Sequence, residues 1–119
     1  MQRDPRSVDE LIADHVAGCA LEQRFYTDPQ IYELELERVV YRNWIVAGHV
    51  SELPDPGDFK VIRVARESAI IVRGEDGDLR AFANVCRHRG SLLCLEERGH
   101  IEKFSCPYHG WKYGLDGRL

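Results

Sequence analysis

The chain has 119 residues, which is room for about one domain with a modest core. Its formal charge is −4, from 16 basic and 20 acidic residues, without the concentrated basic face of a nucleic-acid-binding domain. The longest apolar run, residues 16–21, is far below the roughly 20 residues of a membrane span, and residues 1–5 do not lead into a secretion signal. We therefore expect a soluble, cytoplasmic protein.

The N-terminal third predicts two helices. Ser7 and Glu10 form the S-x-x-E pattern of a capping box, and apolar residues follow at positions 11, 12, 16 and 21, so a short first helix is expected. Asp28 and Pro29 are typical of the N-cap and first position of a second helix. The apolar residues 31, 34 and 39 share one face of that helix, which should end near Tyr41.

From residue 43 onward the pattern changes to short β-rich runs that predict an antiparallel meander. Turn sequences at residues 54–57, 75–78 and 114–117 separate the runs. The chain stops at Leu119, soon after the last turn, so we expect a sheet that is incomplete at its C-terminus and keeps open edges. The expected division is a helical segment, residues 1–42, and a β domain, residues 43–119. The predicted strands are residues 44–46, 59–64, 69–72, 79–83, 101–105 and 111–113.

Two Cys-His pairs are the strongest chemical signal. Cys86 and His88 form a Cys-x-His pair, and Cys106 and His109 form a Cys-x-x-His pair, with residues 89–105 between them. Two thiolates and two imidazoles are the ligands of a Rieske-type [2Fe-2S] cluster, in which histidines replace two cysteines on one iron and thereby raise the reduction potential. The pattern predicts a site that passes single electrons.

Two other uses of these residues stay open. Two cysteines and two histidines also make an ordinary tetrahedral zinc set, although a Cys-x-His pair is shorter than the spacing typical of zinc fingers. The four cysteines could form two disulfides, but without a secretion signal this is disfavoured. Cys19, in the first helical stretch, and Cys94 are instead predicted to be small buried residues.

The sequences around the pairs resemble a known family. Residues 84–90 (NVCRHRG) and 106–113 (CPYHGWKY), followed by 115–119 (LDGRL), are similar to the Rieske domain of non-haem iron oxygenases of the ring-hydroxylating type, alpha subunit. Respiratory-chain Rieske proteins carry an extra disulfide across the two loops, whereas this chain has Ser91 and Tyr108 at the matching positions. The resemblance therefore favours the oxygenase branch. It covers most of the chain from about Tyr26, through Trp44 and residues 48–49, 56–58 and 76–77.

The resemblance implies a fold and a ligand set. The fold is mainly β with N-terminal helices, a Rieske-type antiparallel β-sandwich, here incomplete at the C-terminus. Cys86 and Cys106 would be thiolate ligands of the inner iron. His88 and His109 would each bind the outer, more exposed iron through one ring nitrogen, which leaves the second nitrogen free to hydrogen-bond or lose a proton.

Residues around the ligands have two readings each. Trp111 and Tyr108 could shield the cluster or hydrogen-bond toward its sulfurs, or they could pack in the core. Arg87 and Arg89 could offset cluster charge or meet an acidic electron donor, or, as exposed loop arginines, they could do neither. Residues 86–119 carry 6 basic and 4 acidic side chains, against 10 and 16 in residues 1–85. The remaining histidines are expected to be structural or on the surface, with His15 and His49 isolated and His100 in a turn between the two loops.

The resemblance also implies a function for the full-length protein. The domain would accept electrons from a reductase or ferredoxin, supplied by NAD(P)H, and pass them to a mononuclear Fe(II) held by two histidines and a carboxylate in a larger C-terminal domain that this sequence lacks. The reaction would be hydroxylation or oxidative demethylation of a small organic substrate by a homo-oligomer, a trimer, and this piece alone is not expected to be catalytic. The alternative is a stand-alone Rieske ferredoxin-like carrier, which has no need of the helical segment ahead of residue 43.

Overall fold

The computed structural model describes residues 6–119, so the start of the polar N-terminal segment, residues 1–5, lies outside the described residues. Contacts divide the chain into two compact units, Met1–Ile45 and Val46–Leu119, and each is described by itself. Within residues 6–119, no helix has the length and apolar character that crossing a bilayer requires.

The first unit is helical. The capping box is confirmed, because the Ser7 hydroxyl accepts from the Glu10 N–H at 3.2 Å and the Glu10 carboxylate accepts from the Ser7 N–H at 2.6 Å. The helix that it starts ends at Ala13, so Cys19 lies in a turn and is exposed, and the prediction of a buried, helical Cys19 is wrong. The elements of this unit are α1 (Val8–Ala13), α2 (Arg24–Thr27), α3 (Pro29–Arg38) and the 3-10 helix η1 (Val40–Arg42).

The start of α3 matches the prediction, and its end and buried face differ. The Asp28 carboxylate caps the helix by accepting from the Gln30 N–H at 2.8 Å. The α-helix ends at Arg38, and the 3-10 helix η1 follows it. The buried residues are Ile31 and Leu36, whereas Val39 is 54% exposed because it lies beyond the last full turn.

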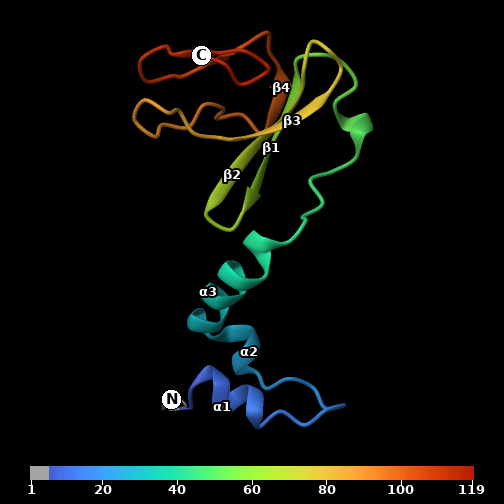
Figure 1. Cartoon of the computed structure of the whole chain (residues 1–119), viewed down its shortest axis with the longest axis vertical. Helices are drawn as coiled ribbons and strands as arrows, with labels where there is room; N and C mark the ends of the chain where they lie inside the picture. The colour runs from blue at the N-terminus through green and yellow to red at the C-terminus, as the bar shows by residue number, and fades with distance from the viewer. Residues whose placement is uncertain (1–5) are drawn as a thin grey trace. The chain divides into compact units, whose positions relative to one another are not determined.

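The second unit is built on antiparallel sheets, so the predicted class, mainly β with N-terminal helices, is confirmed. One sheet has four strands in the order β3-β2-β1-β4, which Figure 1 labels. The other sheet pairs β5 with β6. The strands are β1 (Asp58–Val64), β2 (Glu67–Arg73), β3 (Leu79–Ala83), β4 (Arg98–His100), β5 (Phe104–Ser105) and β6 (Lys112–Tyr113).

One strand prediction and one turn prediction are corrected, and the predicted strand 101–105 is present only as β5. Residues 44–46 form no strand, because a β-rich sequence needs a partner to pair with and this segment has none in the sheets of the described chain. His100 lies in β4 instead of a turn, where it pairs with Asp58 of β1, and its Nδ1 lies 2.9 Å from the Asp58 carboxylate. That contact is the main reason that the pKa of Asp58 is lowered.

The core of this unit joins the sheets to the predicted ligand loops. Phe104 of β5 makes edge-to-face contacts with Phe59 and Phe82, at centroid distances of 6.5 and 6.4 Å. Cys86 and Cys106 belong to the same buried cluster, so both loops start from the core. The buried members of the cluster are Phe59, Ile70, Val72, Cys86, Phe104, Cys106, Tyr113 and Leu115.

Asn84 anchors the chain on either side of the first loop. It is the buried polar residue of this unit, 3% exposed. Its amide oxygen accepts from the N–H groups of Leu93 and Cys94 at 3.1 and 2.8 Å, and its amide nitrogen donates to the Cys94 carbonyl at 2.8 Å. The side chain therefore ties the end of β3 to the segment that follows the loop.

We expect Asn84→Ala to lower the free energy of unfolding by about 1–3 kcal/mol, because it leaves partly buried backbone groups without partners. The measurement is urea unfolding followed by circular dichroism. Asn43→Ala, which removes a solvent-exposed amide, is the matched control and should change stability by less than about 0.5 kcal/mol. Equal effects of the two substitutions would contradict the anchoring role.

The thiols of Cys19 and Cys94 should differ in reactivity. Burial raises the pKa of the half-buried Cys94 to about 11, so roughly one molecule in a thousand carries the nucleophilic thiolate there at pH 8. Iodoacetamide at pH 8 should therefore alkylate the exposed Cys19 at least about tenfold faster than Cys94. Peptide mapping by mass spectrometry measures both rates. The Cys94 rate should rise about tenfold between pH 8 and 9, and equal rates at the two thiols would refute the burial.

Candidate metal centre

The two predicted ligand loops share one backbone design. Loop one is residues 86–91 and loop two is residues 106–111. In each, the N–H of the first residue, Cys86 or Cys106, donates to the carbonyl of the sixth, at 2.7 Å in loop one and 2.8 Å in loop two. The N–H of the fifth residue donates back to the cysteine carbonyl at 2.9 Å in both loops. Two loops distant in sequence therefore present their cysteines in equivalent positions.

Glycine makes this design possible. The fifth residue is Gly90 in loop one and Gly110 in loop two, with φ of +72° and +74°, a region that other residues adopt at a cost. Histidine is the third residue of loop one and the fourth residue of loop two. Because of this one-residue difference, the two imidazoles start from different positions on loops whose backbones are otherwise equivalent.

Burial separates the sulfur donors from the nitrogen donors. The side chains of Cys86 and Cys106 are buried, 1% and 4% exposed, whereas His88 and His109 are exposed. The two imidazole rings lie close together, with centroids 4.8 Å apart and planes at 65°. The structure thus places both thiols in one buried cluster and the two imidazoles side by side at the surface.

The four donors match the ligand set of a mixed-ligand [2Fe-2S] cluster. Among residues 6–119, no three His, Cys, Asp or Glu side chains gather closely enough to hold a single ion. Tetrahedral zinc needs its protein ligands around one point, whereas each iron of a mixed-ligand [2Fe-2S] cluster takes two protein ligands and shares sulfides with the other iron. Two sulfurs and two nitrogens meet the cluster's requirement, and the Cys-x-His pair of loop one is shorter than the spacing typical of zinc fingers.

Tyr113 is a site residue that the sequence reasoning missed. Its hydroxyl lies 3.3 Å from Cys86 Sγ and accepts the Arg87 N–H at 3.2 Å, which leaves its own proton to donate to the sulfur. This hydrogen bond is the main reason that the pKa of Cys86 is lowered, with help from the His88 N–H and the Cys106 thiol. The same bond, with burial, raises the pKa of Tyr113. The site therefore favours a Cys86 thiolate.

A pattern in the sequence could have found this tyrosine. In the sequence, charged Lys112 precedes Tyr113 and apolar Leu115 follows two positions later, an alternation that predicts Tyr113 on the buried face of a strand. A phenol on the core side needs a polar partner, and the predicted thiolates are the polar atoms there.

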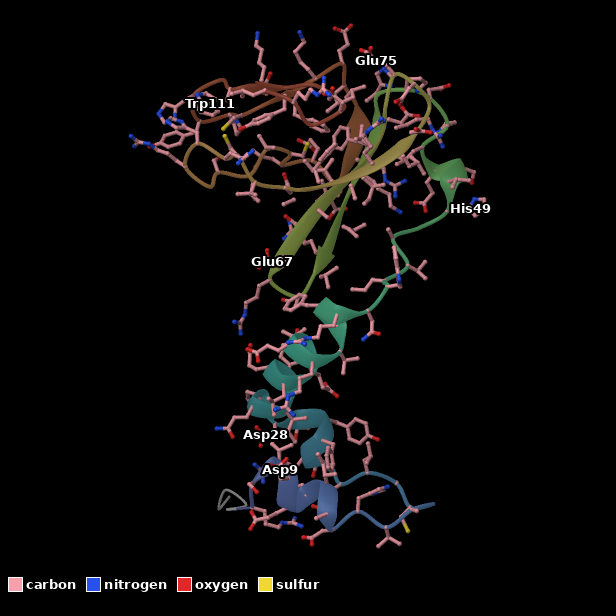
Figure 2. All side chains as sticks on the ribbon, viewed as in Figure 1. Asp9, Asp28, His49, Glu67, Glu75 and Trp111 are labelled. Atoms are coloured by element: carbon pink, nitrogen blue, oxygen red, sulfur yellow. The ribbon has the colours of Figure 1, made fainter. Side chains whose placement is uncertain are left out.

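Trp111 and Tyr108 lie on the exposed side, so the core-packing reading of both is wrong. The Trp111 indole stacks on the His88 imidazole with centroids 4.6 Å apart and planes 5° from parallel. Tyr108 touches the His109 ring at a centroid distance of 3.9 Å with the planes tilted by 38°. Figure 2 shows Trp111 at the outer end of the loop region.

The other predicted residues keep to the surface. Arg87 and Arg89 are exposed on loop one, where an acidic electron donor could reach them. His15 is exposed in the helical unit. His49 is structural, because its ring accepts the Ser51 N–H and caps the 3-10 helix η2 (Val50–Glu52).

Comparison with known proteins places the chain in a domain family. A family model described as the Rieske [2Fe-2S] domain matches residues 43–119. The chain is 42% identical over 100 residues to a glycine betaine monooxygenase oxygenase subunit of Pseudomonas aeruginosa, covering 84% of this chain and 23% of that protein. It is 40% identical over 119 residues to the biphenyl 2,3-dioxygenase subunit alpha of Rhodococcus jostii, covering 98% and 26%.

Solved structures of Rieske oxygenases also match this chain. The quaternary ammonium Rieske monooxygenase CntA matches with a TM-score of 0.76 and 44% identity over 81% of this chain and 27% of its own. Naphthalene 1,2-dioxygenase from Rhodococcus sp. matches with a TM-score of 0.76 and 39% identity over 78% and 21%. The chain thus spans about a quarter of the length of the proteins that it resembles.

Proposed function

Because the chain belongs to the Rieske [2Fe-2S] domain family, among the Rieske domains of non-haem iron oxygenase alpha subunits, we propose that Cys86, His88, Cys106 and His109 hold a [2Fe-2S] cluster. When bound, such a cluster accepts and gives up one electron at a time. The observation that carries the proposal is the pair of equivalent loops, each offering one sulfur and one nitrogen donor. We propose residues 43–119 as the cluster-binding domain and residues 1–42 as a helical segment ahead of it.

The two kinds of donor have separate tasks. The buried Cys86 and Cys106 are the ligands of the inner iron, because their sulfurs face the core. His88 and His109 are the ligands of the outer iron, because their rings face solvent, where an electron-transfer partner can approach. Tyr113 and the backbone N–H groups of loop one stabilise negative charge on the Cys86 sulfur.

For the full-length protein we propose the electron-entry role in an oxygenase alpha subunit. Electrons would come from NAD(P)H through a reductase or ferredoxin and go to a mononuclear Fe(II), for hydroxylation or demethylation of a small organic substrate. The support is the oxygenase names of the relatives and the quarter of their length that this chain spans. Exposed Arg87 and Arg89 suit an acidic electron donor. A homotrimer and a cytoplasmic location complete the proposal.

A stand-alone ferredoxin-like carrier is the alternative. The match to the Rhodococcus jostii alpha subunit covers 98% of this chain and therefore includes the helical unit, which favours the oxygenase. The DNA that encodes the residues after Leu119 decides between them. A long continuation with a closely spaced pair of histidines and a later aspartate supports the oxygenase, and a stop after a few dozen codons supports the carrier.

The ligand assignment predicts the composition and spectrum of the purified chain. The parent should hold about two irons and two acid-labile sulfides and, when reduced, give the EPR spectrum of a mixed Cys/His cluster. His88→Ala and His109→Ala should each abolish that spectrum, whereas His49→Ala, which changes a histidine in a cap, should retain it. A colourless parent with one zinc, or an unchanged spectrum in either ligand variant, would refute the assignment.

The Tyr113 hydrogen bond predicts the direction of a potential shift. Tyr113→Phe removes one donor to the Cys86 sulfur, so the more negative reduced state loses stabilisation and the midpoint potential should fall by on the order of tens of millivolts. Protein-film voltammetry at one pH measures the shift. Tyr108→Phe removes an exposed hydroxyl from the same loop region and should leave the potential within error. A rise in the potential of Tyr113→Phe would contradict the assigned direction of the hydrogen bond.

A further inference from the structure

Trp111 and His88 form the flattest ring contact at the site. The indole and imidazole planes are 5° apart with centroids at 4.6 Å, although the two residues belong to different loops. We propose that Trp111 is a positioning residue, which holds the His88 imidazole in one plane from across the site. The inference rests on the proposed function, in which His88 is a ligand.

His88 needs such support. A metal-binding histidine is usually oriented by a hydrogen bond from its second ring nitrogen to a carboxylate or a carbonyl. The ring contacts that the structure gives His88 are with Trp111 and His109, and neither is a hydrogen bond. His109 is itself a proposed ligand, so Trp111 is the neighbour that can hold the ring in its plane.

Trp111 is itself well fixed. Its carbonyl accepts the Cys106 N–H at 2.8 Å and so closes loop two, and the next residue, Lys112, pairs with Ser105 in the β5-β6 sheet. The indole therefore starts from a backbone position that two sets of hydrogen bonds define. Because the indole is fixed by loop two, its contact with the His88 ring restricts how that ring, on loop one, can turn.

The second imidazole has a different neighbour. Tyr108 precedes His109 directly in the chain, and its ring is tilted by 38° instead of stacked. That contact lies within one loop and cannot link the two. Tyr108→Leu is therefore a matched control, because it removes an aromatic ring from beside the other histidine.

The first test uses the full chain without a cluster. Diethyl pyrocarbonate modifies accessible imidazoles, and peptide mapping gives the rate at each histidine. In Trp111→Leu we expect His88 to react about twofold to tenfold faster than in the parent, as the loss of one aromatic pair implies, with His109 unchanged. Trp111→Phe, which keeps a flat ring, should restore most of the protection, and Tyr108→Leu should not affect His88.

The second test uses the cluster-loaded chain. Pulsed EPR of the reduced protein resolves the nitrogen couplings of the two histidines. We expect Trp111→Leu to change one coupling and to broaden it, and Trp111→Phe to return it toward the parent value. Circular dichroism checks that every variant is folded, and Trp111→Met, which also lacks a ring, replaces the leucine variant in both tests if that variant is not folded.

The outcomes are separable. A folded Trp111→Leu with unchanged His88 reactivity, or with equal gains at His88 and His109, overturns the positioning role. A parent chain that binds no iron overturns the proposed function, and the reactivity of His88 in the cluster-free chain then still decides what Trp111 does.

Discussion

The site depends on one repeated constraint, a six-residue loop closed at both ends by hydrogen bonds to its cysteine. The cysteine N–H and carbonyl are both used in closing the loop, so the direction of the side chain is set by the backbone. Gly90 and Gly110 make the closure possible through positive φ. Because both loops start in the core cluster, the same constraint buries both sulfurs and leaves the histidines outside.

The charge of the site follows from this division. A buried thiolate needs compensation, which Tyr113 supplies to Cys86 together with N–H groups of loop one. The exposed imidazoles, as the proposed ligands, would bind in their neutral form and would bring no charge to compensate. A centre with this asymmetry would be stabilised in its reduced state from the protein side and would exchange electrons on the solvent side.

Local signals in the sequence predicted the parts that are determined locally. The Ser7–Glu10 capping box, the Asp28 cap and the hairpins around residues 75–78 depend on neighbouring residues, and all are present. Two of the failures depend on distant partners. Residues 44–46 have strand-forming side chains without a strand to pair with, and the role of Tyr113 depends on a sulfur 27 positions away. The four ligand candidates were found because their spacing reflects a backbone design that the loops repeat.

The most direct test of the account is Mössbauer spectroscopy of the chain loaded with iron-57. Two iron sites of equal area are predicted, one with the parameters of all-sulfur coordination and one shifted by nitrogen ligands, with the added electron on the second site after reduction. A single kind of iron site, or two sites that both have all-sulfur parameters, would contradict the claim that these two loops divide sulfur and nitrogen between two metals.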